Sequence, residues 1–217
     1  AVLYAAGNGK FYKSTDDGDN WQQITNGIPN GSRSVIAVTE ADPNYVYCLL
    51  SDGDSYKGTW LSTDGGDSFT QMSSSPNIMS WGCEGGSGGQ AWYDLDIAAD
   101  PLDKNTIFAG GVNCFKSTDS GTTWEISSHW WGDCGVPSVH ADLHILEYNP
   151  LNNRIYAGND GGIYLQKNPN SVATHLLDIP ITQFYACAID FQQPERLYGG
   201  TQDNGTSVMQ DGVWHEW

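Results

Sequence analysis

The sequence has little positive charge. Its 9 lysines and arginines stand against 26 aspartates and glutamates, so the formal net charge is −17. Such a surface repels phosphate groups, and we therefore expect neither nucleic acid nor an anionic membrane as a partner. Solubility and cation binding remain as explanations of the acidic balance.

Long hydrophobic runs are also missing. No apolar stretch is long enough to cross a membrane, so we expect no membrane insertion, and no signal peptide is recognisable. The chain starts at Ala1, as a processed or excised piece would. It also lacks a phosphate-binding loop, a serine nucleophile elbow and a Cys-x-x-Cys pair, and we expect no cofactor.

What the sequence does contain indicates a folded all-β protein. Hydrophobic residues make up 39% of the chain, and 9 tryptophans and 11 tyrosines accompany 26 glycines. This composition is typical of short strands separated by glycine-rich turns. Five cysteines are compatible with an oxidising, extracellular compartment, although the odd number leaves at least one thiol without an intramolecular partner.

One pattern occurs three times: Ser-Thr-Asp-x-Gly-x-x, followed by Trp or Phe. The Asp side chain can bond the backbone two residues on, the Gly can take the positive φ of a tight hairpin, and the aromatic ring can fold back into a core. The defining positions are Ser14, Asp16, Gly18 and Trp21; Ser62, Asp64, Gly66 and Phe69; and Ser117, Asp119, Gly121 and Trp124.

This pattern resembles the Asp box, or bacterial neuraminidase repeat, which closes the hairpin between the third and fourth strands of β-propeller blades. The resemblance implies a propeller of four-stranded antiparallel blades. Sialidases, xyloglucanases and the sortilin ectodomain share the repeat, so it implies little about activity. A sialidase needs three convergent arginines, whereas this chain has only Arg33, Arg154 and Arg196, and the last two occupy equivalent turns.

A second landmark, an acidic or amide residue before proline, marks the blades. It occurs at Asp42-Pro43, Asp100-Pro101, Asn149-Pro150 and Gln193-Pro194, each time shortly before a β-rich pair. Together the landmarks predict one propeller portion over residues 1–217, with blades at about 1–26, 34–73, 91–127, 139–178 and 183–217. The first blade lacks its innermost strand, and the fourth and fifth have degenerate boxes. We interpret the chain as part of a larger propeller; a self-closed five-blade ring is the alternative.

His140, Asp142 and His144 are the clearest candidates for a catalytic or metal-binding site. On a strand, residues two apart share a face, so two imidazoles would flank a carboxylate on the innermost strand of blade four. Such a set could bind a metal or move a proton, or it could be a polar ladder packed between blades. We expect no metal, because a third or fourth ligand is not evident. With the turns 159–162 and 202–205, this stretch is similar to secreted Bacteroidetes-type propeller proteins exported by type IX secretion.

Asp94 and Asp96 are further catalytic candidates. They lie two apart before the Pro turn of blade three, and paired carboxylates suit glycosidic acid–base chemistry. Counted back from the proline of each blade, however, they fall on the opposite face of the strand from His140, Asp142 and His144, unless a bulge intervenes. A structural role for the pair is therefore the other interpretation.

Two long glycine-rich loops precede blades three and four. Tryptophans and acids in them suit stacking on sugar rings, or alternatively cap the blade edges; the residues are Trp81, Trp92, Trp130, Trp131 and Asp133. Because both loops leave the same face of adjacent blades, we predict a disulfide between Cys83 and Cys134. Cys48, Cys114 and Cys187 fall in predicted strands and are expected to be buried.

Two functions remain open at this point. The first is a secreted or cell-surface propeller without catalysis, which binds a glycan or a protein through its loops. The second is a glycoside hydrolase that uses carboxylates facing the central channel.

Overall fold

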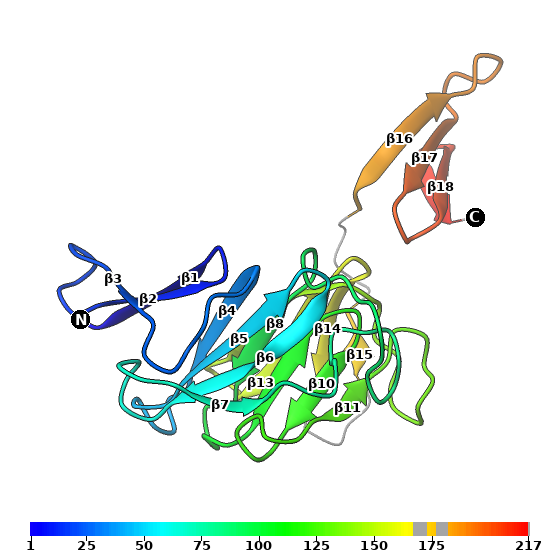
Figure 1. Ribbon diagram of the computed structural model, residues 1–217. Helices are drawn as coiled ribbons and strands as arrows, with labels where there is room; N and C mark the ends of the chain where they lie inside the picture. The colour runs from blue at the N-terminus through cyan, green and yellow to red at the C-terminus, as the bar shows by residue number, and fades with distance from the viewer. Residues whose placement is uncertain (167–172, 177–181, 217) are drawn as a thin grey trace.

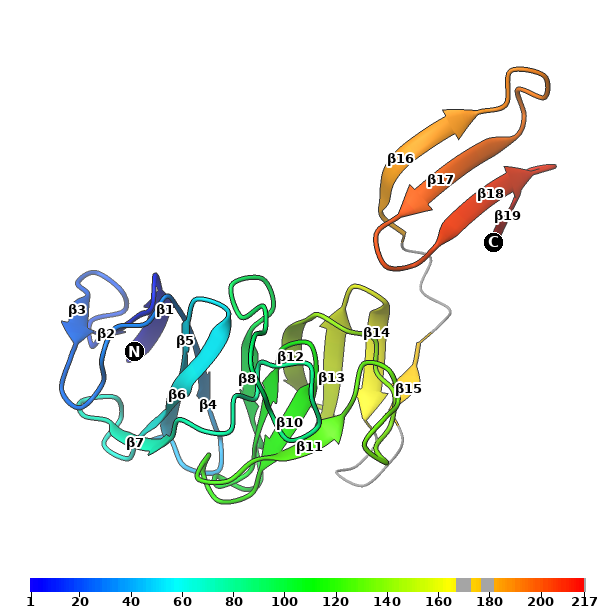
Figure 2. The same ribbon diagram turned by 45° about the vertical axis from the view of Figure 1, so that its right-hand side comes forward.

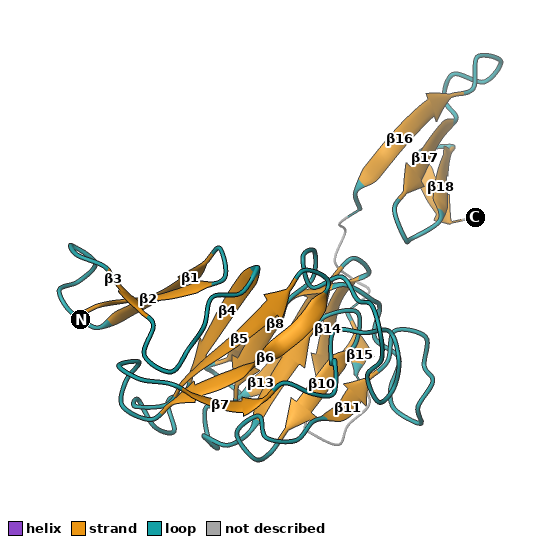
Figure 3. Ribbon diagram, viewed as in Figure 1, coloured by secondary structure: helices purple, strands orange, loops and turns teal. Residues whose placement is uncertain are grey.

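The computed structural model describes residues 1–166, 173–176 and 182–216. Their regular secondary structure consists of β-strands joined by turns and loops, as Figure 3 shows. No helix that could cross a membrane is found among these residues. The prediction of an all-β fold is confirmed.

The strands form five antiparallel sheets in chain order. The first sheet has three strands and the second has four: β1 (Leu3–Gly7), β2 (Lys10–Ser14), β3 (Gln22–Ile24), then β4 (Arg33–Val38), β5 (Val46–Asp52), β6 (Ser55–Ser62), β7 (Thr70–Ser73). The third and fourth sheets contain β8 (Asp96–Ala99), β9 (Ile107–Gly110), β10 (Cys114–Ser117), β11 (Glu125–Ser128), then β12 (Leu143–Asn149), β13 (Arg154–Asn159), β14 (Gly162–Gln166), β15 (Thr174–His175). The fifth sheet contains β16 (Phe184–Ile189), β17 (Leu197–Thr201), β18 (Thr206–Gln210) and β19 (Val213–Glu216).

The first four sheets stand side by side in an arc, and the fifth lies apart from them (Figures 1 and 2). The first strand of each sheet faces the inside of the arc, where β4 neighbours β1 and β8, and β12 neighbours β8. These strands and the proline turns beside them line a hollow of about 700 Å³. The first and fifth sheets do not meet, so the described residues do not form the closed five-blade ring.

Apolar side chains fill the space between successive sheets in the arc. Between the second and third sheets, the core includes Tyr47, Leu49 and Phe115, all almost fully buried. Phe11 and Val46 belong to the core between the first and second sheets. A sheet therefore becomes stable by covering both faces with its neighbours, because each face alone would leave a large apolar area in water.

The three Ser-x-Asp-x-Gly turns have one hydrogen-bond pattern. In the second sheet, Ser62 Oγ donates to Asp64 (2.7 Å), while Gly66 N donates to Ser62 Oγ (2.8 Å). Ser68 N donates to the same Asp64 carboxylate at 3.0 Å. The turns at 14–20 and 117–123 repeat these contacts. The prediction that each Asp bonds backbone N–H groups of its own turn is confirmed.

After the second and third turns, the aromatic residue packs against the preceding sheet. Phe69 is 6% exposed and meets the Phe11 ring edge-on at 4.8 Å between centroids. Trp124 is partly buried and donates from Nε1 to Ser73 Oγ at 3.1 Å. Trp21, which we expected in a core, is 44% exposed, so that expectation is wrong. It follows the turn of the first sheet, and no sheet precedes that one to cover it.

The degenerate turns are only partly described. The fourth-sheet turn between β14 and β15 includes residues 167–172, which lie outside the described residues. In the fifth sheet, Asp211 and Gly212 have φ of 53° and 77° and close a tight hairpin between β18 and β19.

Candidate functional site

The strand directions bring the long loops and one set of turns to the same end of the sheets. In the second to fifth sheets, the first strand starts at this end and the second strand returns to it. In the first sheet, the turn between β1 and β2 lies at this end, beside the start of β4. We call this end the loop face; it comprises the loops 74–95 and 129–142 and the turns 110–113, 159–162 and 201–206. The Ser-x-Asp-x-Gly turns and the proline turns lie at the opposite end.

A disulfide joins the two long loops. Cys83 and Cys134 are bonded, with their Cα atoms 5.7 Å apart, as the loop positions predicted. Cys48 and Cys114 are buried thiols, and burial raises the pKa of each to about 12. Cys187 is exposed, contrary to our expectation, because no described residue covers the inner strand of the fifth sheet.

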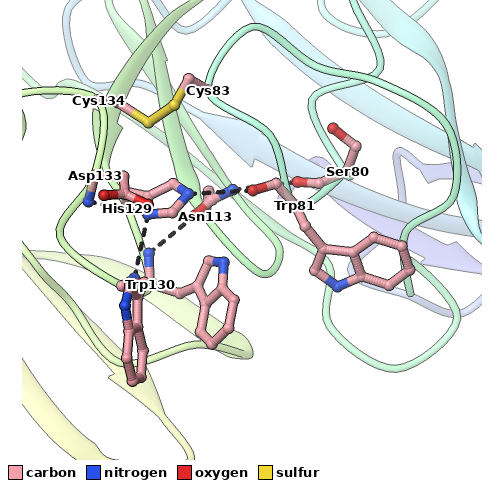
Figure 4. The surroundings of a disulfide bond; sticks show 9 residues. Ser80, Trp81, Cys83, Asn113, His129, Trp130, Asp133 and Cys134 are labelled. Atoms are coloured by element: carbon pink, nitrogen blue, oxygen red, sulfur yellow. Dashed lines mark hydrogen bonds between the residues drawn. A yellow bond between two sulfur atoms is a disulfide. The ribbon is translucent and has the colours of Figure 1, made fainter.

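His129 connects the same loops by hydrogen bonds (Figure 4). It is 5% exposed, and its Nδ1 accepts from the backbone N of Trp131 (3.2 Å) and of Asp133 (3.3 Å). Nδ1 therefore carries no proton, and Nε2 donates to the carbonyl of Trp81 at 3.2 Å. The sequence analysis did not single out His129; its only signal was its place beside two tryptophans and near a cysteine.

Four tryptophans of the loop face have much of their surface in solvent. The exposed fractions are 49% for Trp81, 65% for Trp92, 39% for Trp130 and 72% for Trp131. Trp60, which lies in a strand, is only 3% exposed. The rings of Trp92 and Trp131 therefore do not cap the blade edges, which was the alternative interpretation.

Arg33 at the start of β4 holds the segment before β8. Its guanidinium donates to the carbonyls of Tyr93 (2.8 Å), Trp92 (3.3 Å) and Leu95 (3.4 Å). The backbone N of Tyr93 also donates to Gln90 O at 2.7 Å, which makes this segment a turn. Trp92 and Tyr93 are thus fixed by a residue from the neighbouring sheet, a role that no sequence pattern predicted.

Asp94 and Asp96 do not share the face of one strand. The turn ends just before β8, so Asp94 precedes the strand, and its carboxylate accepts from Gln90 Nε2 at 3.2 Å. Asp96 is the first strand residue, and its Oδ2 accepts from Leu146 N of β12 at 2.6 Å. Burial raises the pKa of Asp96 to about 6, although the hydrogen bond from Leu146 N acts to lower it.

Asp94 and Asp142 are joined through Gln90. The Gln90 amide nitrogen donates to both carboxylates, and Asp94 is completely buried. Burial raises the pKa of Asp94 to about 8, and the nearby charge of Asp142 adds to the increase. The pKa of Asp142 is also raised, by burial and by the charges of Asp160 and Asp203.

His140, Asp142 and His144 do not line one face of a strand. Strand β12 begins only at Leu143, Asp142 has a φ of 65°, and the register shifts between Leu143 and Ile145. The His140 ring instead packs on Gly161, where a Cβ would lie 2.4 Å from its Cγ. The left-handed residue and the bulge break the period-2 alternation on which the prediction depended.

Asp160, in the turn between β13 and β14, gathers side chains from two sheets. Tyr93 Oη donates to it at 3.1 Å and His144 Nε2 at 2.8 Å, and the Tyr93 and His144 rings meet edge-on. Burial raises the pKa of Tyr93 to about 12, with a further contribution from Asp160. Trp92 lies next to this group, with its ring centroid 5.6 Å from that of Tyr93.

Three carboxylates converge at this point. One oxygen from each of Asp142, Asp160 and Asp203 lies within 4.8 Å of the others, and we call the three residues the acidic cluster. Asp203 comes from the turn between β17 and β18, the equivalent position one sheet later. The site therefore combines exposed indole rings with carboxylates and a histidine at the loop face.

Some known proteins resemble the chain in sequence or in fold. No family model matches the sequence. A xyloglucanase from Paenibacillus sp is 27% identical over 220 residues, which is 89% of this chain and 21% of the relative. The chain thus spans about a fifth of the length of that curated relative.

Several solved structures resemble the chain at low sequence identity. An ancestral GH74 enzyme aligns with a TM-score of 0.57 and 17% identity over 100% of this chain and 29% of its own. The Niastella koreensis GH74 enzyme aligns with a TM-score of 0.57 and 18% identity, over 99% of this chain and 36% of its own. YCF48 bound to a D1 peptide aligns with a TM-score of 0.55 and 14% identity, over 99% of this chain and 64% of its own. Together with the five antiparallel sheets, these likenesses identify the fold as that of a β-propeller.

Proposed function

We propose that this chain belongs to a secreted or cell-surface propeller of the Asp-box type and binds a glycan through its loop face. The observation that carries the proposal is the exposure of Trp92 and Trp131 on loops that are held in place. Fixed exposed indoles present flat apolar surfaces, and the C–H faces of pyranose rings stack on such surfaces. The xyloglucanase relative makes a β-linked polysaccharide the first class to test.

The loops around these rings are pre-organised. The disulfide and His129 fix Trp81 and Trp131 relative to each other, while Arg33 fixes Trp92. Ordering a loop costs conformational entropy, and a loop already ordered leaves more of the contact energy for binding. The exposed Asp133 and the half-buried Asp160 supply carboxylate acceptors for sugar hydroxyls beside the rings.

Calorimetric titration with xyloglucan, cello-oligosaccharides and sialyllactose tests this proposal. Trp92→Ala should weaken binding of the recognised glycan by about tenfold or more, where each tenfold step corresponds to about 1.4 kcal/mol. Trp21→Ala is the matched control, because Trp21 is similarly exposed but lies at the opposite end of the sheets. If the chain binds none of these glycans but does bind a protein, the glycan proposal is wrong and the loop face is a protein-binding surface.

Glycoside hydrolysis is the second candidate, and the name of the 27% identical relative favours it. Hydrolysis needs two carboxyl groups about 5–9.5 Å apart across the scissile bond. Asp94 and Asp142 share one amide donor and Asp94 is fully buried, so this pair does not fit a sugar between its members. Asp142 and Asp160 are half-buried at the loop face, so unlike Asp94 they are open to contact with a polysaccharide.

Release of reducing sugar from xyloglucan distinguishes the two functions. Hydrolysis that Asp142→Asn abolishes, in a variant whose melting temperature and glycan affinity match the parent, supports an enzyme. Binding without hydrolysis over long incubation supports the non-catalytic role.

We also infer that these sheets belong to a larger ring in an extracellular protein. The inner strand of the fifth sheet is open, and the aligned propellers extend well beyond the matched part. A disulfide between exposed loops persists in oxidising compartments, which favours secretion, and the resemblance to Bacteroidetes-type propellers favours export by type IX secretion. Mass determination of the native secreted protein tests both points, because a closed five-blade particle of this chain alone would contradict the larger ring.

A further inference from the structure

The acidic cluster holds like charges together without a basic partner of fixed charge. Ligand oxygens of Asp142, Asp160 and Asp203 lie within 4.8 Å of one another. In the described part of the chain, no lysine or arginine forms an ion pair with any of them, and His144 is bonded to Asp160 alone. Three carboxylates at this separation repel one another, so the arrangement favours a bound counter-charge, or else a proton on one of the acids.

A buried oxygen without a partner lies beside the cluster. Asp94 is 0% exposed, and its Oδ1 has no hydrogen-bond donor among the described residues. The Gln90 amide nitrogen donates to both the Asp94 and the Asp142 carboxylates, so Asp94 lies directly beside the acidic cluster. Buried polar atoms nearly always have partners, and a cation bound beside Asp142 would satisfy this oxygen.

We propose that the acidic cluster binds one calcium ion, which bridges the fourth and fifth sheets. The donors are carboxylate oxygens, which hard cations such as Ca²⁺ prefer, whereas zinc prefers nitrogen and sulfur ligands. Calcium accepts six to eight oxygens in flexible geometry, so three carboxylates and water can complete its shell. The ion would bind at the loop face but does not require that the loop face binds a glycan.

The position of the ion explains how the fifth sheet is attached. Asp142 and Asp160 belong to the fourth sheet and the loop before it, while Asp203 belongs to the fifth. Besides the cluster, two hydrogen bonds between described residues cross this junction: His140 Nε2 donates to Asp203 O (3.3 Å), and Asn204 Nδ2 donates to Asp160 O (2.7 Å). Since the inner strand of the fifth sheet is exposed, a bridging ion would add the strongest link at this junction.

Equilibrium dialysis of the full chain, stripped with a chelator and titrated with CaCl₂, tests the proposal. We expect one ion per chain, with a Kd of about 10⁻⁴ to 10⁻³ M as in other extracellular calcium modules. Asp203→Asn should weaken binding at least about tenfold, because it removes one of three charged ligands. The Asp203 carboxylate makes no hydrogen bond with the described residues and Asn tolerates its positive φ of 63°, so the variant should fold.

Asp211→Asn is the matched control, since it removes an exposed carboxylate with positive φ from the other end of the fifth sheet. It should bind calcium like the parent. Calcium should also raise the melting temperature of the parent and of Asp211→Asn, but not of Asp203→Asn. No calcium binding by the parent, equal binding by Asp203→Asn, or tighter binding of zinc than of calcium would overturn the proposal. None of these readouts uses a glycan, so they are independent of the proposed function.

Discussion

The third and fifth sheets have the same strand order but opposite surroundings. In the third sheet, Ile97 on the inner strand is 4% exposed and Phe108 on the next strand is 1% exposed. On the inner strand of the fifth sheet, Tyr185 is 64% and Ile189 is 55% exposed. Both sheets form regular antiparallel ladders, so local sequence suffices for the strands, and neighbouring sheets supply the burial.

This comparison predicts a large difference between two phenylalanines. Phe108→Ala should lower the free energy of unfolding by about 3–5 kcal/mol, because it leaves a cavity between the third and fourth sheets. Phe191→Ala should change it by less than about 0.5 kcal/mol, because Phe191 is 97% exposed. Urea unfolding of both variants measures the difference. Equal losses would mean that the fifth sheet packs in solution as the third does.

The fold was predictable because its signals are local. The turn from Ser62 to Phe69 and the proline turns specify hairpins by short-range hydrogen bonds and by φ, and these features are written in adjacent residues. The exposure of Trp21 was not predictable in this way. Its turn is the same as that before Phe69, and only the neighbour of the first sheet differs.

The disulfide is a second difference between the arc and the fifth sheet. It joins two loops of the arc, whereas the cysteine of the fifth sheet, Cys187, is a free thiol. Replacing Cys83 and Cys134 together by alanine should cost about 2–4 kcal/mol, since the bond closes a loop of 51 residues in the unfolded chain. Thermal unfolding with and without a reducing agent checks this value. The double variant should be insensitive to the reductant; a parent that is equally insensitive would contradict the prediction.

The candidate site was predictable only in part. The disulfide and the exposed tryptophans could be predicted, because the position of each loop follows from the repeat. The cluster around Asp160 combines residues from three sheets, brought together by a left-handed Asp142 and a bulge in β12. The period-2 rule assumes regular strands, so it placed His140 and His144 on one face, whereas tertiary contacts with Gly161 and Asp160 decide their positions.

The half-buried acid Asp96 on β8 predicts a pH dependence that has no counterpart on the inner strand of the fifth sheet, because β16 contains no acidic residue. The pKa of Asp96 is raised from 3.8 to about 6 in the folded protein, so the fold favours the protonated form. Its contribution to stability is therefore fully present below about pH 4 and is lost as the pH rises to about 6. Relative to Asp96→Asn, the parent should lose on the order of 2 kcal/mol between pH 4 and pH 7.

Urea unfolding of both proteins at the two pH values gives this difference. Asn can still accept the hydrogen bond from Leu146 N, so Asp96→Asn should keep the strand contact. Asp211→Asn controls for the change in net charge. A parent that gains stability over this interval relative to Asp96→Asn would show that the sign is wrong.

The smallest expected effect belongs to Trp21, which occupies the same place in its turn as Phe69. Phe69→Ala should cost about 3–5 kcal/mol, because Phe69 is 6% exposed and packs on Phe11. Trp21→Ala should cost less than about 1 kcal/mol, because 44% of Trp21 is in solvent and no sheet covers that side. Unfolding curves of this chain measure both. In a longer polypeptide that places another sheet against β1–β3, the cost of Trp21→Ala should rise toward that of Phe69→Ala. An unchanged cost there would mean that the first sheet has a free outer face, and the larger ring would then have to close elsewhere.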